Sequence, residues 1–252
     1  MKSLYLLVNF FTIIIPFLFS FHPKIRFHLT WKAFFPAAIL VGVMFVIWDE
    51  LFTAMGVWGF NPDYVTGIYL FNLPLEEVLF FICIPFSCVF TYFCLDRFFD
   101  LSWNPKVEDA FSVIFSLALL LAGIVFYERI YTFVTFISTG LVCLTLKYII
   151  KVNWFGKAAL VYGILLIPFF IVNGILTGTG LESPVVWYDH SENLNIRILT
   201  IPIEDAIYGF ELILVNLYFY KLFLGLKNRR SKKMSSLSTT AISSTPNDEV
   251  KQ

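Results

Sequence analysis

The sequence predicts an all-α, polytopic membrane protein of about seven transmembrane helices, with two parallel three-helix repeats joined by a linking helix. Three observations support this: the composition, the apolar runs and an internal repeat. Of 252 residues, 58% are hydrophobic and 14% are charged, with a mean hydropathy of +0.78. Soluble domains average about 25% charged residues, and one of this size could not bury so much apolar surface.

Apolar runs long enough to cross a bilayer, about 17–25 residues, occur seven times. Lys2 is the only charged residue before the first run, and no small-residue cleavage pattern follows the run. We therefore interpret this run as a retained helix rather than a signal peptide. The runs define a seven-helix membrane domain at 1–228 and leave a Ser/Thr-rich tail at 229–252, which we expect to be disordered. The seven apolar runs are 3–21, 34–54, 74–95, 107–127, 130–150, 156–177 and 200–222.

Basic residues predict the orientation of the chain. They gather at 22–33, 147–157 and 227–233, whereas the segment between the last two helices is mainly acidic. The positive-inside rule places the basic segments, and with them the C-terminus, in the cytoplasm. An odd number of spans then leaves the N-terminus outside. We expect a multi-pass protein of the bacterial cell membrane.

The two halves of the domain, about 3–98 and 128–226, repeat one another on either side of the linking helix at about 107–127. A stretch "PLEEVLFF" begins at Pro74, and "PIEDAIYGF" begins 128 residues later at Pro202. Matched motifs in both halves favour an internal duplication. Four spans separate the third helix from the seventh, so the repeats are parallel and both motifs lie at the outer ends of their helices.

Each motif carries a pair of acids at the start of an apolar helix. The pairs are Glu76 with Glu77, and Glu204 with Asp205. Acids within membrane spans are costly and point to function. Two neighbouring carboxyl groups in an apolar site do not both ionise easily, which leaves a general acid beside a general base. The alternative is a structural role, because proline and acids also stabilise the first turn of a helix.

A second block of the repeat, upstream and offset by 124 residues, places Asp49 opposite Asn173 at a similar depth. Glu211 lies two turns below Glu204 on the same helix face, and aromatic residues are dense near the acids. Aromatic faces attract cations, so acids with aromatic walls suit the protonation of an alkene and the shielding of the resulting carbocation. The expected supporting or substrate-binding residues are Asp49, Trp48, Phe80, Phe81, Asn173, Tyr208 and Glu211.

These stretches, "WDELF…GVWGF…LPLEEVLFF" and "VNGILTGTGL…IPIEDAIYGFELILVNLYFY", resemble the two halves of the integral-membrane lycopene cyclase family over about 3–225. The resemblance implies redox-neutral β-cyclisation of the linear ends of lycopene, giving γ-carotene and then β-carotene. It implies that Glu76, Glu77, Glu204 and Asp205 are catalytic and that the enzyme needs no flavin. A related cyclase acting on a C50 carotenoid is an alternative.

The residues also bear on cofactors and partners. The string "GTGLES" at 178–183 lacks the third glycine and the preceding strand of a dinucleotide site, and the four cysteines all fall within spans, so we expect neither a cofactor nor a metal. The expected partners are a linear carotenoid and the lipid bilayer, with a homo-oligomer or other carotenoid-pathway enzymes as further candidates and no nucleic acid. A seven-helix transport or binding protein with buried carboxylates is the competing class.

The topology predicts which segments a membrane-impermeant thiol reagent reaches. After replacement of the native cysteines, single cysteines at positions 63 and 189 should be labelled from the outer side, and cysteines within 22–33 from the cytoplasmic side. Labelling of 63 and 189 from opposite sides would contradict the parallel repeats.

Overall fold

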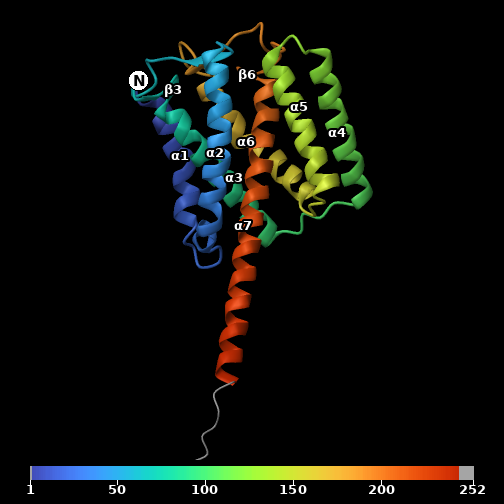
Figure 1. Ribbon diagram of the computed structural model, residues 1–252. Helices are drawn as coiled ribbons and strands as arrows, with labels where there is room; N and C mark the ends of the chain where they lie inside the picture. Colours follow the sequence, from blue (N-terminus) through green and yellow to red (C-terminus); the bar gives the residue numbers. More distant parts are fainter. Residues whose placement is uncertain (1, 244–252) are drawn as a thin grey trace, which may run out of the picture.

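The computed structural model describes the backbone of residues 2–243 and the side chains of residues 2–227. Seven α-helices lie side by side and alternate in direction (Figure 1). A short 3₁₀ helix at Phe27–Thr30 precedes α2, and a π-helical turn at Thr145–Ile149 extends α5. The helices are α1 Leu4–Phe19, α2 Trp31–Ala54, α3 Leu75–Phe98, α4 Pro105–Val125, α5 Ile130–Leu144, α6 Phe155–Leu176 and α7 Ile203–Ser243.

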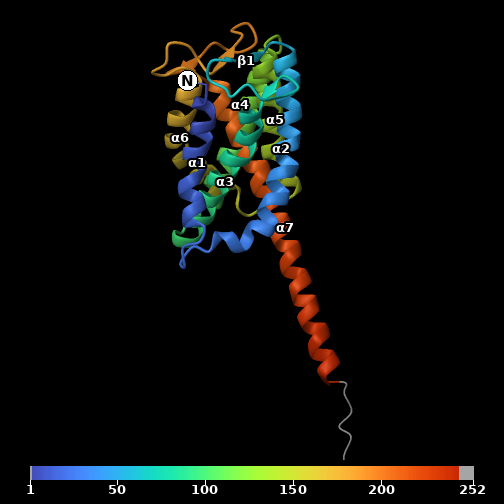
Figure 2. The ribbon, with the colours of Figure 1, turned by 90° about the vertical axis from the view of Figure 1, so that its left-hand side faces the viewer.

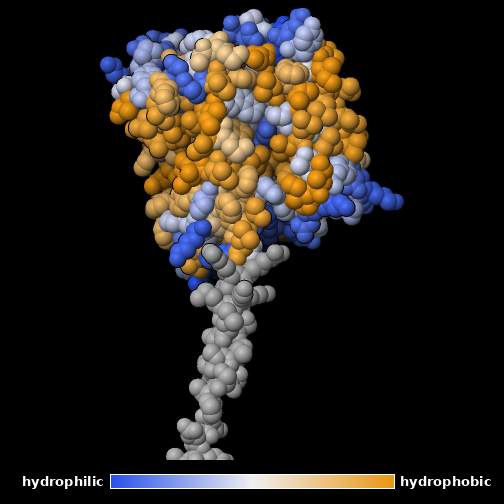
Figure 3. All heavy atoms as spheres, in the orientation of Figure 1, coloured by the Kyte–Doolittle hydropathy of each residue, from blue (hydrophilic) through white to orange (hydrophobic). Residues whose placement is uncertain are grey.

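The helices confirm the predicted fold class, an all-α multi-pass membrane protein. Six of them are long and apolar enough to span a membrane. The remaining helix, α1, has 16 residues and is about 24 Å long, shorter than the roughly 30 Å of a hydrocarbon core. It packs along α3. On the face shown in Figure 3, hydrophobic side chains cover the middle of the body, and hydrophilic residues gather toward its two ends.

The helices divide as the repeat predicts, into α1–α3 and α5–α7. Helix α4 packs against α5 at the edge of the bundle (Figure 1). Helices α3 and α7 begin at the same end of the body, directly after β3 and β6. Both acid pairs therefore lie at one end of the bundle, as expected for parallel repeats.

The loops at this end contain three two-stranded sheets that the sequence did not predict, because strands of two or three residues show no periodicity. Two of them are hairpins, β2 Tyr69–Leu70 with β3 Leu73–Pro74 and β5 Arg197–Ile198 with β6 Ile201–Pro202. The hairpins are offset by the same 128 residues as the acid motifs. Their tips also match, since Phe71 and Leu199 have φ angles of 56° and 58°.

The third sheet joins the two halves. Strand β1, Trp58–Phe60, pairs antiparallel with β4, Val186–Tyr188. These strands are themselves counterparts at an offset of 128, and Gly59 faces Trp187 at the centre of the pairing. An antiparallel pairing of two equivalent strands has a local twofold axis at its centre. The pseudo-twofold axis that relates the halves therefore passes through the Gly59–Trp187 pair.

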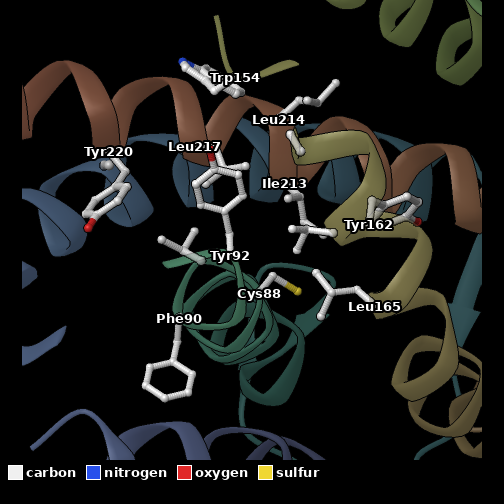
Figure 4. Packing of buried hydrophobic residues seen from close by; sticks show 14 of the residues in the cluster. Cys88, Phe90, Tyr92, Trp154, Tyr162, Leu165, Ile213, Leu214, Leu217 and Tyr220 are labelled. Carbon is white, nitrogen blue, oxygen red and sulfur yellow. The ribbon is translucent and has the colours of Figure 1, made fainter. Parts of the chain in front are cut away.

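At the other end of the body, α3, α6 and α7 share an apolar core (Figure 4). Tyr92 and Tyr220, which occupy equivalent positions of the repeat, are both buried there, together with Leu214 and Leu217. Trp154, just before α6, belongs to the same cluster. This core holds α3 and α7 together below the acid motifs.

Helix α7 differs from the sequence-based expectation at its C-terminal end. The tail predicted to be disordered begins at 229, but the backbone of residues 229–243 continues the helix, which projects beyond the body (Figures 1 and 2). The chain has neither glycine nor proline from 226 to 245, so nothing in the sequence breaks the helix there. The rest of that prediction, over 244–252, lies outside the described residues.

The close approach at the pseudo-twofold axis predicts a sensitive glycine. A Cβ atom on Gly59 would lie 2.4 Å from Cζ2 of Trp187. We expect Gly59→Ala to destabilise the protein by about 1–3 kcal/mol, as overpacking of a filled site does. Thermal unfolding in detergent measures the change. Gly163→Ala is the control, because nothing lies within 4 Å of a Cβ there; equal melting temperatures for the two variants would contradict the prediction.

Candidate functional site

A cavity of about 630 Å³ lies among α1, α3, α6 and α7. Along α3 its lining runs from Glu77 to Thr91, a rise of about 21 Å. Cys88, Leu165 and Ile213 line its deep end, where they meet between α3, α6 and α7 (Figure 4). The cavity is therefore long, narrow and mostly apolar, with its acids at the outer end.

The cavity opens sideways between α1 and α6, which lie side by side in Figure 2. Five of its lining residues are also exposed on the surface of these helices: Leu7, Phe11, Ile15, Pro168 and Ile171. In a membrane this surface faces lipid. A hydrophobic molecule dissolved in the bilayer can therefore reach the cavity without crossing water.

Three buried carboxyl groups line the outer end of the cavity: Asp49, Glu77 and Asp205. Glu77 and Asp205 each accept a hydrogen bond from a tyrosine hydroxyl. The Tyr5 hydroxyl donates to Glu77 at 2.5 Å, and the Tyr131 hydroxyl donates to Asp205 at 2.6 Å.

The strands that join the repeats add two further aromatic residues. Trp58 of β1 lines the cavity, as Asp49 does, and the Tyr188 hydroxyl in β4 donates to Asp205 at 2.9 Å. Burial and the neighbouring Asp205 raise the pKa of Tyr188 well above its usual value of 10.0, so this hydroxyl keeps its proton and remains a donor.

The other member of each acid pair points away from the cavity. Glu76 accepts a hydrogen bond from the backbone N–H of Thr66 at 2.7 Å, and Glu204 accepts one from the N–H of Leu194 at 2.8 Å. These two loop positions are again offset by 128 residues. Glu204 also accepts from the Thr132 hydroxyl at 2.6 Å. Both side chains are almost fully buried, with 1% and 0% exposure.

The structure thus separates two positions that the sequence could not distinguish. Adjacent residues of a helix point about 100° apart, so only one acid of each pair can face the cavity. Glu77 and Asp205 face it, whereas Glu76 and Glu204 anchor the outer loops onto the bundle. The bonds of Glu76 and Glu204 go to loop N–H groups and not to the first turn of their own helices, so this structural role differs from the helix-start role considered for the sequence.

The predicted supporting residues also divide into two groups. Four of them line the cavity: Asp49, Phe80, Asn173 and Tyr208. The cavity lining does not include Trp48, Phe81 or Glu211. Trp48 and Phe81 pack in an apolar cluster between α2, α3 and α7. Glu211 accepts from the hydroxyls of Ser138 and Thr139 at 2.7 and 2.8 Å, because this face of α7 lies against α5.

Sequence reasoning missed the tyrosine donors. Tyr5 and Tyr131 occupy matching positions of "LYLLV" and "IYTFV", 126 residues apart, so the repeat contained a signal for them. Tyr188 lies in a loop where no motif marks it. Its role depends on β4 pairing with β1, which only the tertiary structure shows.

The charged side chains that line the cavity are all acidic. Among the residues that the structure describes, none that lines the cavity is a lysine, arginine or histidine. Within the same residues, no group of three histidine, cysteine or acidic side chains is placed to hold a metal ion. Outside the lining, the guanidinium carbon of Arg197 lies 5.7 Å from the ring centroid of Tyr188, which donates to Asp205. Carboxyl groups gathered in an apolar site disfavour one another's ionisation.

A family model described as lycopene cyclase matches residues 2–95 and 128–223, the two repeats without α4. The chain belongs to the lycopene cyclase family. Neither a search of curated proteins nor one of solved structures finds a match. Membership of the lycopene cyclase family supports carotenoid cyclase activity in general, and it agrees with a cavity that opens to lipid and carries acids at its closed end.

Two other classes of seven-helix membrane protein, transporters and retinal-binding proteins, find less support than a lycopene cyclase. A transporter of this size typically binds its substrate at broken helices, yet α3 and α6 remain continuous across Pro85 and Pro168. A retinal-binding protein needs a lysine in its ligand cavity. Lys221 of α7 instead packs over Tyr92, 4.7 Å from the ring centroid, and does not line the cavity.

The loop anchors predict a difference between the two acids of each pair. In Glu76→Ala the N–H of Thr66 loses its acceptor, at a cost of about 1–3 kcal/mol for an unsatisfied buried group. We expect limited proteolysis of purified protein to cleave the 55–73 loop faster in this variant than in Glu77→Ala, because Glu77 accepts from Tyr5 of α1 and not from the loop. Cleavage at the same rate in both would show that Glu76 does not hold the loop.

Proposed function

We propose that this protein is a lycopene β-cyclase, which converts the linear ends of lycopene into β-ionone rings by way of γ-carotene to β-carotene. The observation that carries the proposal is the cluster of Asp49, Glu77 and Asp205 with its tyrosine donors, at the closed end of an apolar cavity open to lipid. The family match supports the same reaction class.

The proposed reaction is an isomerisation and balances without a cofactor. A carboxylic acid gives its proton to the terminal double bond of the polyene. The resulting carbocation is attacked by a neighbouring double bond, which closes a six-membered ring and moves the positive charge into it. A carboxylate then removes a proton, and the ring double bond forms. One proton enters, one leaves, and no electrons are transferred.

The geometry supports this sequence of steps in two ways. First, three carboxyl groups that disfavour one another's ionisation supply an acid and a base within one site. Second, tyrosine hydroxyls on Glu77 and Asp205 stabilise the charged form of each after it gives up its proton. The cavity-facing acids, Glu77 and Asp205, are thus the stronger candidates for proton transfer, with Asp49 next to Glu77 as a third.

The aromatic residues that line the cavity stabilise the carbocation. The ring of Trp58 lies edge-on to Tyr131, with centroids 5.0 Å apart, and Phe80 and Tyr208 line the cavity nearby. Ring faces attract positive charge, and these residues close the outer end of the cavity. A carbocation formed there is held among π systems, and water that would trap it is excluded.

The remaining assignments are also part of the proposal. Glu76 and Glu204 act indirectly, by holding the loops that carry the strands over the site. The basic segments place the C-terminus in the cytoplasm, so the acids lie near the outer face of the bacterial cell membrane. The substrate, a linear carotenoid, reaches the enzyme from the lipid.

Amide variants test the chemistry. Glu77→Gln and Asp205→Asn keep the size of the side chain but remove the acid, so turnover of lycopene should fall on the order of 10²–10⁴-fold. Purified protein in lipid, without added flavin, is given lycopene, and the pigments are separated by chromatography. Both variants should insert into the membrane as wild type does, since an amide is less costly to bury than a carboxylate.

Glu50→Gln is the matched control. Glu50 is the neighbour of Asp49 on α2, but its carboxylate accepts from the backbone and side chain of Asn72 instead of lining the cavity. The Glu50→Gln variant should retain turnover of lycopene. Near wild-type cyclisation by both cavity variants, or an equal loss in Glu50→Gln, would refute the assignment of Glu77 and Asp205.

A further inference from the structure

The repeat generates two equivalent places where a cavity could open to lipid. The observed opening lies between α1 and α6, and the pseudo-twofold axis maps these helices onto α5 and α2. The second place does not open in the same way. Helix α2 contributes only Asp49 to the cavity lining, and α5 contributes only Tyr131.

Two substitutions within the repeat account for the difference. On the open side, Val172 of α6 and Gly209 of α7 line the cavity. Their counterparts, at the offsets of 124 and 128 that align the repeats, are Trp48 of α2 and Phe81 of α3. A valine and a glycine on the open side are therefore replaced by large aromatic rings on the other.

On the closed side these rings are packed among their neighbours. Trp48 packs edge-on against Tyr208 with centroids 5.1 Å apart, and it stacks on Phe45 at 5.7 Å. Phe81 is 1% exposed and packs with Phe45 and Leu212 in the same apolar cluster. Gly209 has no side chain, and the rim on α1 remains exposed to lipid at Phe11.

We infer that a linear carotenoid enters only between α1 and α6, and that Trp48 and Phe81 close the equivalent entrance between α2 and α5. This inference rests on the proposed function for the identity of the ligand. With one entrance, both cavity-facing acids act on the same end of the molecule while the other end extends toward the lipid. A product with one ring must leave, turn and re-enter before its second end is cyclised.

Filling the open entrance is the first test. Val172→Trp places at the mouth the residue found on the closed side, and lycopene binding and kcat/KM should both fall on the order of tenfold or more. Binding is measured as lycopene that co-elutes with purified protein in lipid nanodiscs. Ile167→Trp adds the same ring to α6 at a residue that is 68% exposed and does not line the cavity, and should change neither quantity.

Unaltered binding and turnover in an inserted Val172→Trp protein would overturn the inference. If tryptophan prevents insertion, Val172→Phe makes the same test with a smaller ring. The two readouts separate this inference from the proposed function. Wild type that binds lycopene but never cyclises it refutes the function alone, whereas cyclisation by wild type and by Val172→Trp at equal rates refutes the entrance alone.

Opening the closed side is the second test. Trp48→Val with Phe81→Ala, combined with Val172→Trp, should regain part of the lost binding and turnover. No recovery in an inserted protein would show that the two aromatics are ordinary packing residues.

The fate of the one-ringed intermediate is the third test. Deuterated γ-carotene added during turnover of unlabelled lycopene should appear in β-carotene in proportion to its share of the γ-carotene pool. β-Carotene without label would show that the second end is cyclised without release, and would overturn the single-entrance sequence.

Discussion

Buried carboxyl groups in an apolar helix bundle are the constraint on which the outer half of this protein depends. An acid inside a membrane protein is stable only when hydrogen-bond donors surround it. Tyr5 and Tyr131 supply those donors from α1 and α5, and the backbone of Thr66 and Leu194 supplies them from the loops. The acids therefore determine how the first helix of each repeat and each outer loop pack onto the helix that carries the motif.

The duplication explains why the site has two acid–tyrosine pairs. The departures from exact repetition explain why the cavity wall differs between its two sides. The hairpins, the acid pairs and the loop anchors follow the same offset. The apolar wall does not, because Trp48 and Phe81 occupy one side where Val172 and Gly209 occupy the other. A symmetric set of acids is thereby combined with an asymmetric cavity, which suits a long substrate with two chemically similar ends.

The separation of acids from water links this packing to the proposed chemistry. A carboxyl group keeps its proton more readily where charge is poorly solvated, and a carbocation survives only where water is excluded. The strands β1 and β4 cross the outer end of the cavity and contribute Trp58 and Tyr188 to it. The same element therefore joins the repeats, covers the site and donates a hydrogen bond to Asp205.

The sequence by itself determined the membrane-spanning helices, the parallel repeats and the position of both acid motifs at one end of the bundle, because apolar run length and matched motifs are local patterns. It could not decide which acid of each pair faces the substrate, since that depends on the rotation of α3 and α7 against their neighbours. It did not reveal the pairing of β1 with β4, and it ranked Trp48 and Phe81 with the residues that line the cavity. Only the tertiary structure decided these points, because a cavity is formed by side chains from distant helices and its shape depends on which of them are small.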